Sequence, residues 1–285
     1  MGSVTLLSCT PNPEKVVACS AKLCYSNSTI DGIMDGLDDE KVSSFVEMLS
    51  DIGHESPIEH ASYTFGISGI SRSCLAQITR HRMASYSVQS QRYVNESEIF
   101  DYVIPPQIES NEEAKEEFVR IMKETKSSYD KLSKLLKDIN KKELIDNGKS
   151  EKSADKAAEK KAIEDARFVL PNACVTKMIC TMNARSLLNF FRHRCCMRAQ
   201  WEIRDIAMQM FELVLKESYD IFKNAGPACL RGKCPEGKMC CGKAGQVKEM
   251  FESIKKSCAK EELSKEEEPV KEESPGEEEE SFNEK

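Results

Sequence analysis

The stretch Tyr63-Thr64-Phe65-Gly66-Ile67-Ser68 alternates apolar and polar residues, which is typical of a strand with one buried face. A second short strand is expected over residues 4–7. Most of the remaining sequence has helical periodicity. We expect helices over 13–25, 41–52, 72–81 and 111–142, and two more within 178–215 that separate near 194–198. The pattern predicts an α+β fold: one domain in which helices flank a sheet.

Three segments differ in composition from the rest of the 285-residue chain. Residues from about 143 to 160 are charged and have almost no apolar side chain larger than Ala, so we interpret them as a solvated insertion, either a loop or an exposed helical extension. Residues 226–258 are rich in Gly and Cys. Residues 259–285 are acidic and of low complexity, and we expect a disordered tail there. These limits assign residues 1–225 to the main domain.

The formal net charge of -7 is unevenly distributed along the chain. Residues 261–285 contain 12 acidic residues and 3 lysines, so the other residues together carry a small net positive charge. The whole-chain charge would argue against anionic ligands, but the charge of the main domain does not.

The sequence indicates a cytoplasmic protein with no membrane partner. No apolar run approaches the ~20 residues needed to cross a bilayer, and the N-terminus lacks a secretory signal. The 13 cysteines are therefore expected to be reduced thiols. Four of them are spaced C-x4-C-x5-C-C, unlike the paired C-x2-C of common zinc modules, so a metal site competes here with a thiol-rich segment that binds no metal. These four metal candidates are Cys229, Cys234, Cys240 and Cys241.

The densest cluster of polar side chains is the segment 80–93, Arg-His-Arg-Met-Ala-Ser-Tyr-Ser-Val-Gln-Ser-Gln-Arg-Tyr. Arginine presents a planar fork of donors that suits phosphate oxygens, and serine can complete such a site. A solvated basic loop is the competing interpretation. A nucleotide-binding or nucleic-acid-binding module is the alternative function, although the chain lacks the lysine-rich stripe of a general nucleic-acid binder.

A second cluster follows in the expected helical region, where Arg185 and Asn189 are one turn apart and share a face. They lie among Leu and Phe residues, so they need polar partners, which a bound ligand can supply. An exposed stripe that includes Arg192 is the other interpretation. The chain contains no HExxH, GxSxG, GxGxxG or P-loop motif, which argues against the common zinc hydrolases, serine hydrolases, Rossmann proteins and NTPases.

The order of several motifs resembles the flavin-dependent thymidylate synthase family. Arg-His-Arg at 80–82, followed after seven residues by Ser90, resembles the family signature RHR-x7-S. The segment His-Glu-Ser-Pro-Ile-Glu-His at 54–60 and the stretch around Arg167 resemble two further family elements. Asn-Ala-Arg-Ser-Leu at 183–187 and Ala-Gln-Trp-Glu-Ile-Arg at 199–204 resemble its C-terminal core. The resemblance extends over residues 4–222.

The resemblance implies the reductive methylation of dUMP to dTMP. In this family methylenetetrahydrofolate donates the carbon, FAD carries the hydride, NADPH is the reductant, and no enzyme cysteine acts as nucleophile. It further implies a mostly antiparallel central sheet and a homotetramer with active sites at the subunit interfaces. No nucleic-acid partner is expected on this interpretation.

The resemblance also implies roles for individual residues. Arg194 is the expected catalytic residue, at the uracil edge. The residues expected to bind FAD are Ser56, Arg80, His81, Arg82, Val88, Asn183, Arg185 and Asn189. Those expected to bind dUMP are Gln77, Arg80, Gln89, Ser90, Gln91, Arg92, Arg167 and Arg194. Three positions depart from residues common in the family: Ser87, Val88, where only the backbone could serve, and Arg198.

Overall fold

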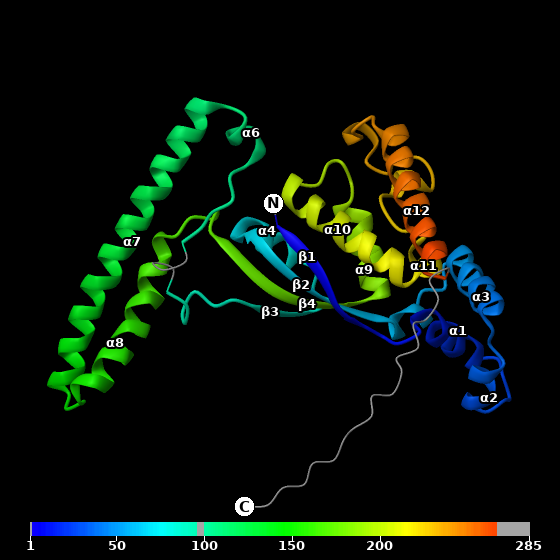
Figure 1. Cartoon of the computed structure of the whole chain (residues 1–285), viewed down its shortest axis with the longest axis horizontal. Helices are drawn as coiled ribbons and strands as arrows, with labels where there is room; N and C mark the ends of the chain where they lie inside the picture. The colour runs from blue at the N-terminus through cyan, green and yellow to red at the C-terminus, as the bar shows by residue number, and fades with distance from the viewer. Residues whose placement is uncertain (1, 96–99, 267–285) are drawn as a thin grey trace, which may run out of the picture.

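A four-stranded antiparallel sheet forms the centre of the molecule in a computed structural model that describes residues 2–95 and 100–266, with side chains described up to residue 258. Its strands are β1 (Ser3–Cys9), β2 (Ser62–Ser71), β3 (Ser85–Val88) and β4 (Val175–Asn183), in the order β1-β2-β4-β3 (Figure 1). The α+β fold and the mostly antiparallel sheet predicted above are confirmed.

The two faces of the sheet are covered differently. Tyr63, Phe65 and Ile67 of β2 are fully buried and belong to the hydrophobic core, as do alternate residues of β4. The helices that cover this face contribute Phe190 and Phe211 to the same core. On the opposite face, residues of β1 and β4 are exposed among the described residues, so one side of the sheet has no layer over it in the single chain.

Three of the four helices in the first part of the chain form close to the predicted positions. The four are α1 (Pro13–Leu23), α2 (Ile30–Asp35), α3 (Asp39–Ile52) and α4 (Arg72–Ile78). Local capping explains the limits of α3: the Asp38 carboxylate accepts a hydrogen bond from the Lys41 amide, and Gly53 ends the helix with a φ of 69°. Sequence analysis did not predict the short α2.

The region 178–215 corrects one prediction. Its first residues form the end of β4 rather than a helix, and helices α9 (Ala184–Arg194) and α10 (Trp201–Glu217) follow. Alternate residues of β4, among them Met178, Cys180 and Met182, are buried, as a strand with one buried face requires. A short apolar segment immediately before a helix does not reveal its own period, and pairing with β2 and β3 decides the conformation.

A long helical hairpin lies to one side of the sheet (Figure 1). It follows the short α6 (Pro106–Glu109) and consists of α7 (Glu112–Asp146) and α8 (Glu151–Ala166). The segment predicted as a charged insertion includes most of α8, where Ala154, Ala158 and Ala162 are buried at helical spacing. The small alanine side chains therefore let two charged helices pack closely, and the helical form of the two alternatives is the one found.

The C-terminal part of the described chain packs back on the core at the opposite end of the sheet from the hairpin (Figure 1). It comprises α11 (Tyr219–Phe222) and α12 (Ala244–Glu266), whose Val247 and Phe251 are buried in the main core. Helix α12 continues into the segment predicted as an acidic tail, and residues 267–285 of that segment lie outside the described residues.

No helix among the described residues is long and apolar enough to cross a membrane. Short 3-10 turns complete the order: η1 (Pro57–His60), η2 (Arg167–Val169), η3 (Ala228–Leu230) and η4 (Gly237–Met239).

Candidate active site

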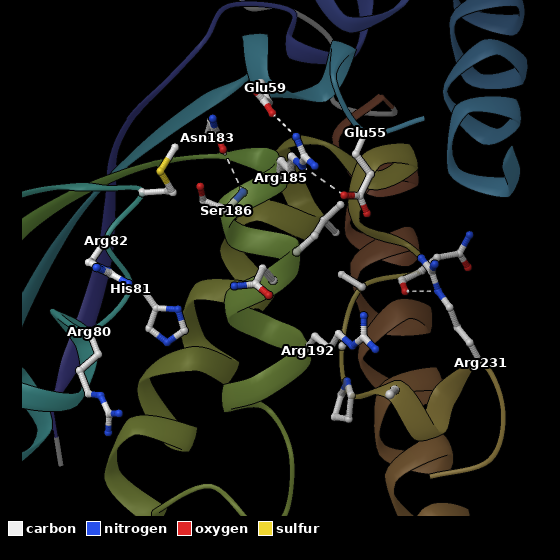
Figure 2. Close-up of a pocket in the computed structure, with 18 of the residues that line it drawn as sticks. Glu55, Glu59, Arg80, His81, Arg82, Asn183, Arg185, Ser186, Arg192 and Arg231 are labelled. Atoms are coloured by element: carbon white, nitrogen blue, oxygen red, sulfur yellow. Dashed lines mark hydrogen bonds and ion pairs between the residues drawn. The ribbon is translucent and has the colours of Figure 1, made fainter. Parts of the chain in front are cut away.

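A polar cavity of about 910 Å³ lies beside α9. We call it the arginine cavity, because five arginines line it: Arg80, Arg82, Arg185, Arg192 and Arg231. Figure 2 shows Arg80, His81 and Arg82 on one side, with Arg192 and Arg231 on the other. Its lining thus combines the motif after α4, a face of α9 and the segment after α11.

Helix α9 presents its polar residues to the cavity as a regular stripe. Asn183 caps the helix by accepting a hydrogen bond from the Ser186 amide at 2.9 Å. Arg185, Asn189 and Arg192 follow at i, i+4 and i+7, so they share the face that lines the cavity. The opposite face of α9 buries Leu187, Phe190 and Phe191.

The Arg-His-Arg motif lies in the connection between α4 and β3. The Tyr86 hydroxyl donates hydrogen bonds to the carbonyl of Ile78 at 3.0 Å and to that of His81 at 2.7 Å, so β3 holds the end of α4. The His81 ring packs edge-on against Phe190, with 4.9 Å between centroids. These contacts fix His81 between α4 and α9.

Arg194 is joined directly to His81. Its Nε–H donates a hydrogen bond to His81 Nε2 at 3.0 Å, so this imidazole nitrogen is an acceptor and the ring is neutral with its proton on Nδ1. Burial lowers the pKa of His81 to about 4, and the positive charges of Arg194, His193 and Arg80 act in the same direction. Burial, and then the charge of Arg80, lowers the pKa of Arg194. Because Nε makes this contact, the terminal nitrogens of Arg194 still form a fork that can face a ligand.

Two carboxylates hold Arg185. Its Nε donates to Glu55 at 3.2 Å and its Nη1 pairs with Glu59 (Figure 2). The hydrogen bond to Glu59 contributes most to raising the pKa of Arg185. Both acidic residues belong to the 54–60 segment, which therefore orients an arginine across the cavity from another part of the chain.

A second polar cluster lies at the end of β3, away from the arginine cavity. Arg92 pairs with Glu164, with Nε 2.9 Å from Oε1, and Arg167 donates from Nε to the Glu164 carbonyl at 3.0 Å. The Ser90 hydroxyl accepts a hydrogen bond from the Arg92 amide at 3.2 Å. Nearby in sequence, Nε2 of Gln91 is buried without a hydrogen-bond partner among the described residues. A buried donor of this kind indicates a place where a ligand or another chain supplies an acceptor.

The predicted residues thus fall into two groups. Six of the eight residues expected to bind FAD line the arginine cavity: Arg80, His81, Arg82, Asn183, Arg185 and Asn189. Ser56 and Val88 do not line it. Of the residues expected to bind dUMP, Arg80 lines this cavity, and Arg194 lines the adjacent cavity, which shares His81 and Asn189 with it. The other dUMP candidates, which line neither cavity, are Gln77, Gln89, Ser90, Gln91, Arg92 and Arg167.

Comparison with known proteins identifies the family. A family model described as thymidylate synthase complementing protein matches residues 5–218. The chain belongs to the flavin-dependent thymidylate synthases. A protein of that name from Clostridium tetani is 52% identical over 248 residues, covering 87% of this chain and 96% of the relative. Those from Geobacter sulfurreducens (44% over 252 residues, 88% and 98%) and Pyrococcus furiosus (37% over 245 residues, 83% and 90%) are also similar. The family predicted from the motif order is confirmed, and the nucleic-acid alternative is not favoured.

Sequence analysis did not assign four charged residues to the arginine cavity of this flavin-dependent thymidylate synthase. Glu55 and Glu59 stand within a motif that was noticed, but nothing in the sequence alone links them to Arg185. Arg192 was named only in the competing interpretation of an exposed stripe, although its i+3 spacing from Asn189 could have placed it on the cavity face. Arg231 arrives from beyond the matched region 5–218, and only tertiary packing brings it to the cavity.

The cysteine candidates lie together, but not as a metal centre. Cys229, Cys234, Cys240 and Cys241 line the second cavity, together with Cys196. Within residues 2–95 and 100–266, no three His, Cys, Asp or Glu side chains are arranged to hold a metal ion. The metal site therefore stays a prediction that the geometry does not support.

Proposed function

We propose that this chain catalyses the reductive methylation of dUMP to dTMP, with methylenetetrahydrofolate as carbon donor, FAD as hydride carrier and NADPH as reductant. The observation that carries the proposal is the gathering of the Arg-His-Arg motif and the polar face of α9 around one cavity, with Arg194 joined to His81. The relatives' name, flavin-dependent thymidylate synthase, supports the choice of reaction.

The arginine cavity fits FAD in size and charge. Small-molecule and cofactor sites measure roughly 300–1,000 Å³, and the volume of about 910 Å³ lies in this range. Guanidinium groups bind pyrophosphate oxygens well. Bound FAD would supply hydride transfer between NADPH and the one-carbon unit. The proposed FAD-binding residues remain Ser56, Arg80, His81, Arg82, Val88, Asn183, Arg185 and Asn189.

In the proposed site Arg194 polarises the pyrimidine. Its fixed, partly desolvated guanidinium would stabilise negative charge that develops on the uracil ring. His81 orients it and, being neutral, adds no repulsive charge beside it. We assign the nucleotide to Gln77, Arg80, Gln89, Ser90, Gln91, Arg92, Arg167 and Arg194, with Ser90 and Arg92 near the phosphate.

Two core thiols beside this machinery are poorly suited to nucleophilic attack. Cys74 and Cys195 are buried, and burial raises the pKa of both thiols above the ordinary range. A thiol attacks as its thiolate, which burial disfavours. Neither of these two thiols is therefore suited to bond to the pyrimidine.

We further propose a homotetramer in which neighbouring subunits complete each site. In a single chain the cluster of Arg92, Glu164 and Arg167 lies apart from the arginine cavity. Leu7 and Ile179 are exposed on the open face of the sheet. A second subunit on that face would cover them and could bring the two groups of site residues together. The 13 cysteines, all free, suit a reducing compartment such as the cytoplasm.

The proposal predicts a flavoprotein. The purified protein should show the visible absorption of bound flavin, and with NADPH, methylenetetrahydrofolate and dUMP it should form dTMP. Arg194→Ala should reduce dTMP formation by about 10²-fold or more, as for the loss of one electrostatic contact to the reacting group, while circular dichroism stays unchanged. The matched control is Arg120→Ala on exposed α7, which should turn over normally. Protein that binds no FAD, or Arg194→Ala with normal turnover, would contradict the proposal.

A further inference from the structure

The second cavity, of about 660 Å³, is lined by five cysteines and adjoins the arginine cavity. We call it the thiol pocket. Cys196 follows α9, and the other four cysteines come from the loops between α11 and α12. His81, Asn189 and Arg192 line both cavities, so the thiol pocket shares a wall with the proposed site.

Within this pocket Cys240 has the surroundings of a reactive thiol. It is exposed, and its sulfur accepts a hydrogen bond from the Gly242 amide at 3.4 Å. Gly242 has a φ of 73°, a conformation that favours glycine. Arg198 donates from Nη1 to the carbonyl of the preceding Met239 at 2.7 Å, which holds a cation beside the thiol. Exposure, an amide donor and a nearby arginine are the features of cysteines that react as thiolates.

Cys234 is the partner that faces Cys240. The two side chains are in hydrogen-bond contact. The Gly242 amide, followed by the contacts with Cys234 and Cys241 and the charge of Arg198, lowers the pKa of Cys240. The Glu236 amide acts to lower the pKa of Cys234, but burial and the contact with Cys240 outweigh it and raise that pKa. The surroundings therefore favour ionisation of Cys240 over that of Cys234.

We propose that Cys240 and Cys234 form a reversible dithiol site that small-molecule disulfides oxidise. The Cys240 thiolate attacks one sulfur of the disulfide, forms a mixed disulfide and expels the other half as a thiolate. Cys234 then attacks the Cys240 sulfur and expels the second half. The two protein thiols become one disulfide, the reagent is reduced to two thiols, and these take up the two protons that the cysteines release.

The bond would fix the loop that contains η4 beside Arg198 and Arg194, which line the same pocket. The inference does not depend on the proposed reaction, because it rests on the contact between the two thiols and on the groups that surround Cys240. A disulfide fits the arrangement better than a metal ion, since the described residues bring no three suitable ligands together.

The test treats the fully reduced full-length protein with glutathione disulfide, blocks the remaining thiols and maps the cysteines by peptide mass spectrometry. We expect the first link to join Cys234 and Cys240, and thiol reductants to reverse it. Cys234→Ser should accumulate glutathione on Cys240, because no second thiol displaces it. Cys240→Ser should react with glutathione disulfide at about one tenth of the unchanged protein's rate or below, because the activated thiol is lost. Cys24→Ser is the matched control, since Cys24 is exposed at the end of α1, and it should behave as the unchanged protein.

A second measurement does not depend on how the variants fold. Iodoacetamide given in limiting amount to the unmodified reduced protein at neutral pH should label Cys240 before the other cysteines. First labelling at another cysteine, or a first disulfide that excludes Cys240, would overturn the proposal. Stoichiometric zinc or iron bound to the reduced protein, released only when these thiols are blocked, would also overturn it, because the thiols would then be metal ligands.

Discussion

Arg194 and His81 share one hydrogen bond, and each limits what the other can do. A charged imidazole could not accept the proton of Arg194 Nε, so the contact at 3.0 Å requires neutral His81. In return Arg194 adds a positive charge that helps to keep the imidazole deprotonated. The middle residue of the Arg-His-Arg motif therefore orients an arginine 113 positions further along the chain, instead of contributing a charge of its own.

This pair predicts a specific pH dependence of stability. The unfolded chain titrates His81 near 6.5, whereas the folded protein does so near 4, so the unfolded state binds more protons between these values. The free energy of unfolding should fall as the pH is lowered from about 6.5 to about 4. Urea unfolding across this range measures it, and NMR titration of the imidazole measures the folded pKa directly.

His81→Asn is the informative variant for this prediction. It retains a polar side chain but does not titrate, so the loss of stability between about pH 6.5 and 4 should become smaller than in the unchanged protein. An imidazole that titrates near its ordinary pKa in the folded protein would show that burial and Arg194 do not control it.

Sequence motifs were sufficient to predict six of the residues that line the arginine cavity, but few of the residues that hold them in place. Arg80, Arg82 and Arg185 meet because α4 and α9 both pack against the sheet. Glu55 could not be assigned as a partner of Arg185, because 130 residues separate them and only the fold brings them together. For the same reason Arg92 was assigned to the nucleotide without any indication that Glu164 pairs with it.

At the scale of elements, a buried carboxylate joins α10 to α4. Glu202 accepts hydrogen bonds from the Ser71 amide at 2.6 Å and from its hydroxyl at 2.5 Å. The Ser71 hydroxyl also caps α4 by accepting the Cys74 amide at 3.0 Å. The helix that leads to the Arg-His-Arg motif is therefore anchored at its start by the first turn of α10.

Removing the charge of Glu202 should weaken this anchor. Glu202→Gln keeps the shape but replaces one acceptor oxygen with a donor, so we expect a loss of about 2 kcal/mol in the free energy of unfolding, the size of one hydrogen bond to a charged group. Urea unfolding checks the value. Glu217→Gln, at the exposed end of the same helix, should change stability little. Equal effects of the two substitutions would rule out the anchoring role.

The elements also show where periodicity is informative. The 63–68 strand was predictable because large and small side chains alternate strictly, and α7 because its apolar stripe is long. β4 was predicted as helix because Met, Cys and Thr suit either conformation, and its ladder with β2 is a long-range contact. α12 was not predicted, because its buried residues Val247, Phe251 and Cys258 are few on a charged background, although they recur at helical spacing.

For the whole molecule, the open face of the sheet predicts how subunits associate. Leu7 lies over Gly66, which pairs with Ile179, so a row of apolar and small residues crosses three strands. Leu7 and Ile179 are 54% and 47% exposed. Exposed apolar side chains on one face are costly in free energy unless another chain covers them. We expect this face to be an interface of the proposed tetramer.

Ile179→Asp should break that interface. Light scattering after size-exclusion chromatography should show a smaller species, and dTMP formation should fall with it, while circular dichroism of the dissociated chain stays native-like. Ile52→Asp on α3 is the control, because Ile52 is an exposed apolar residue on a helix away from the sheet, and it should leave the assembly intact. An unchanged mass for Ile179→Asp would show that the tetramer uses another surface.

The ion pair between Arg92 and Glu164 has a consequence for selectivity. If a nucleotide phosphate binds Arg92, it must first displace a carboxylate that belongs to α8. Glu164 then acts as a tethered competitor that is always present at the same effective concentration. An exposed pair of this kind is worth up to about 1 kcal/mol, so it lowers phosphate affinity by less than tenfold. A doubly charged phosphate, which binds an arginine more strongly than a singly charged anion does, retains more affinity after that loss.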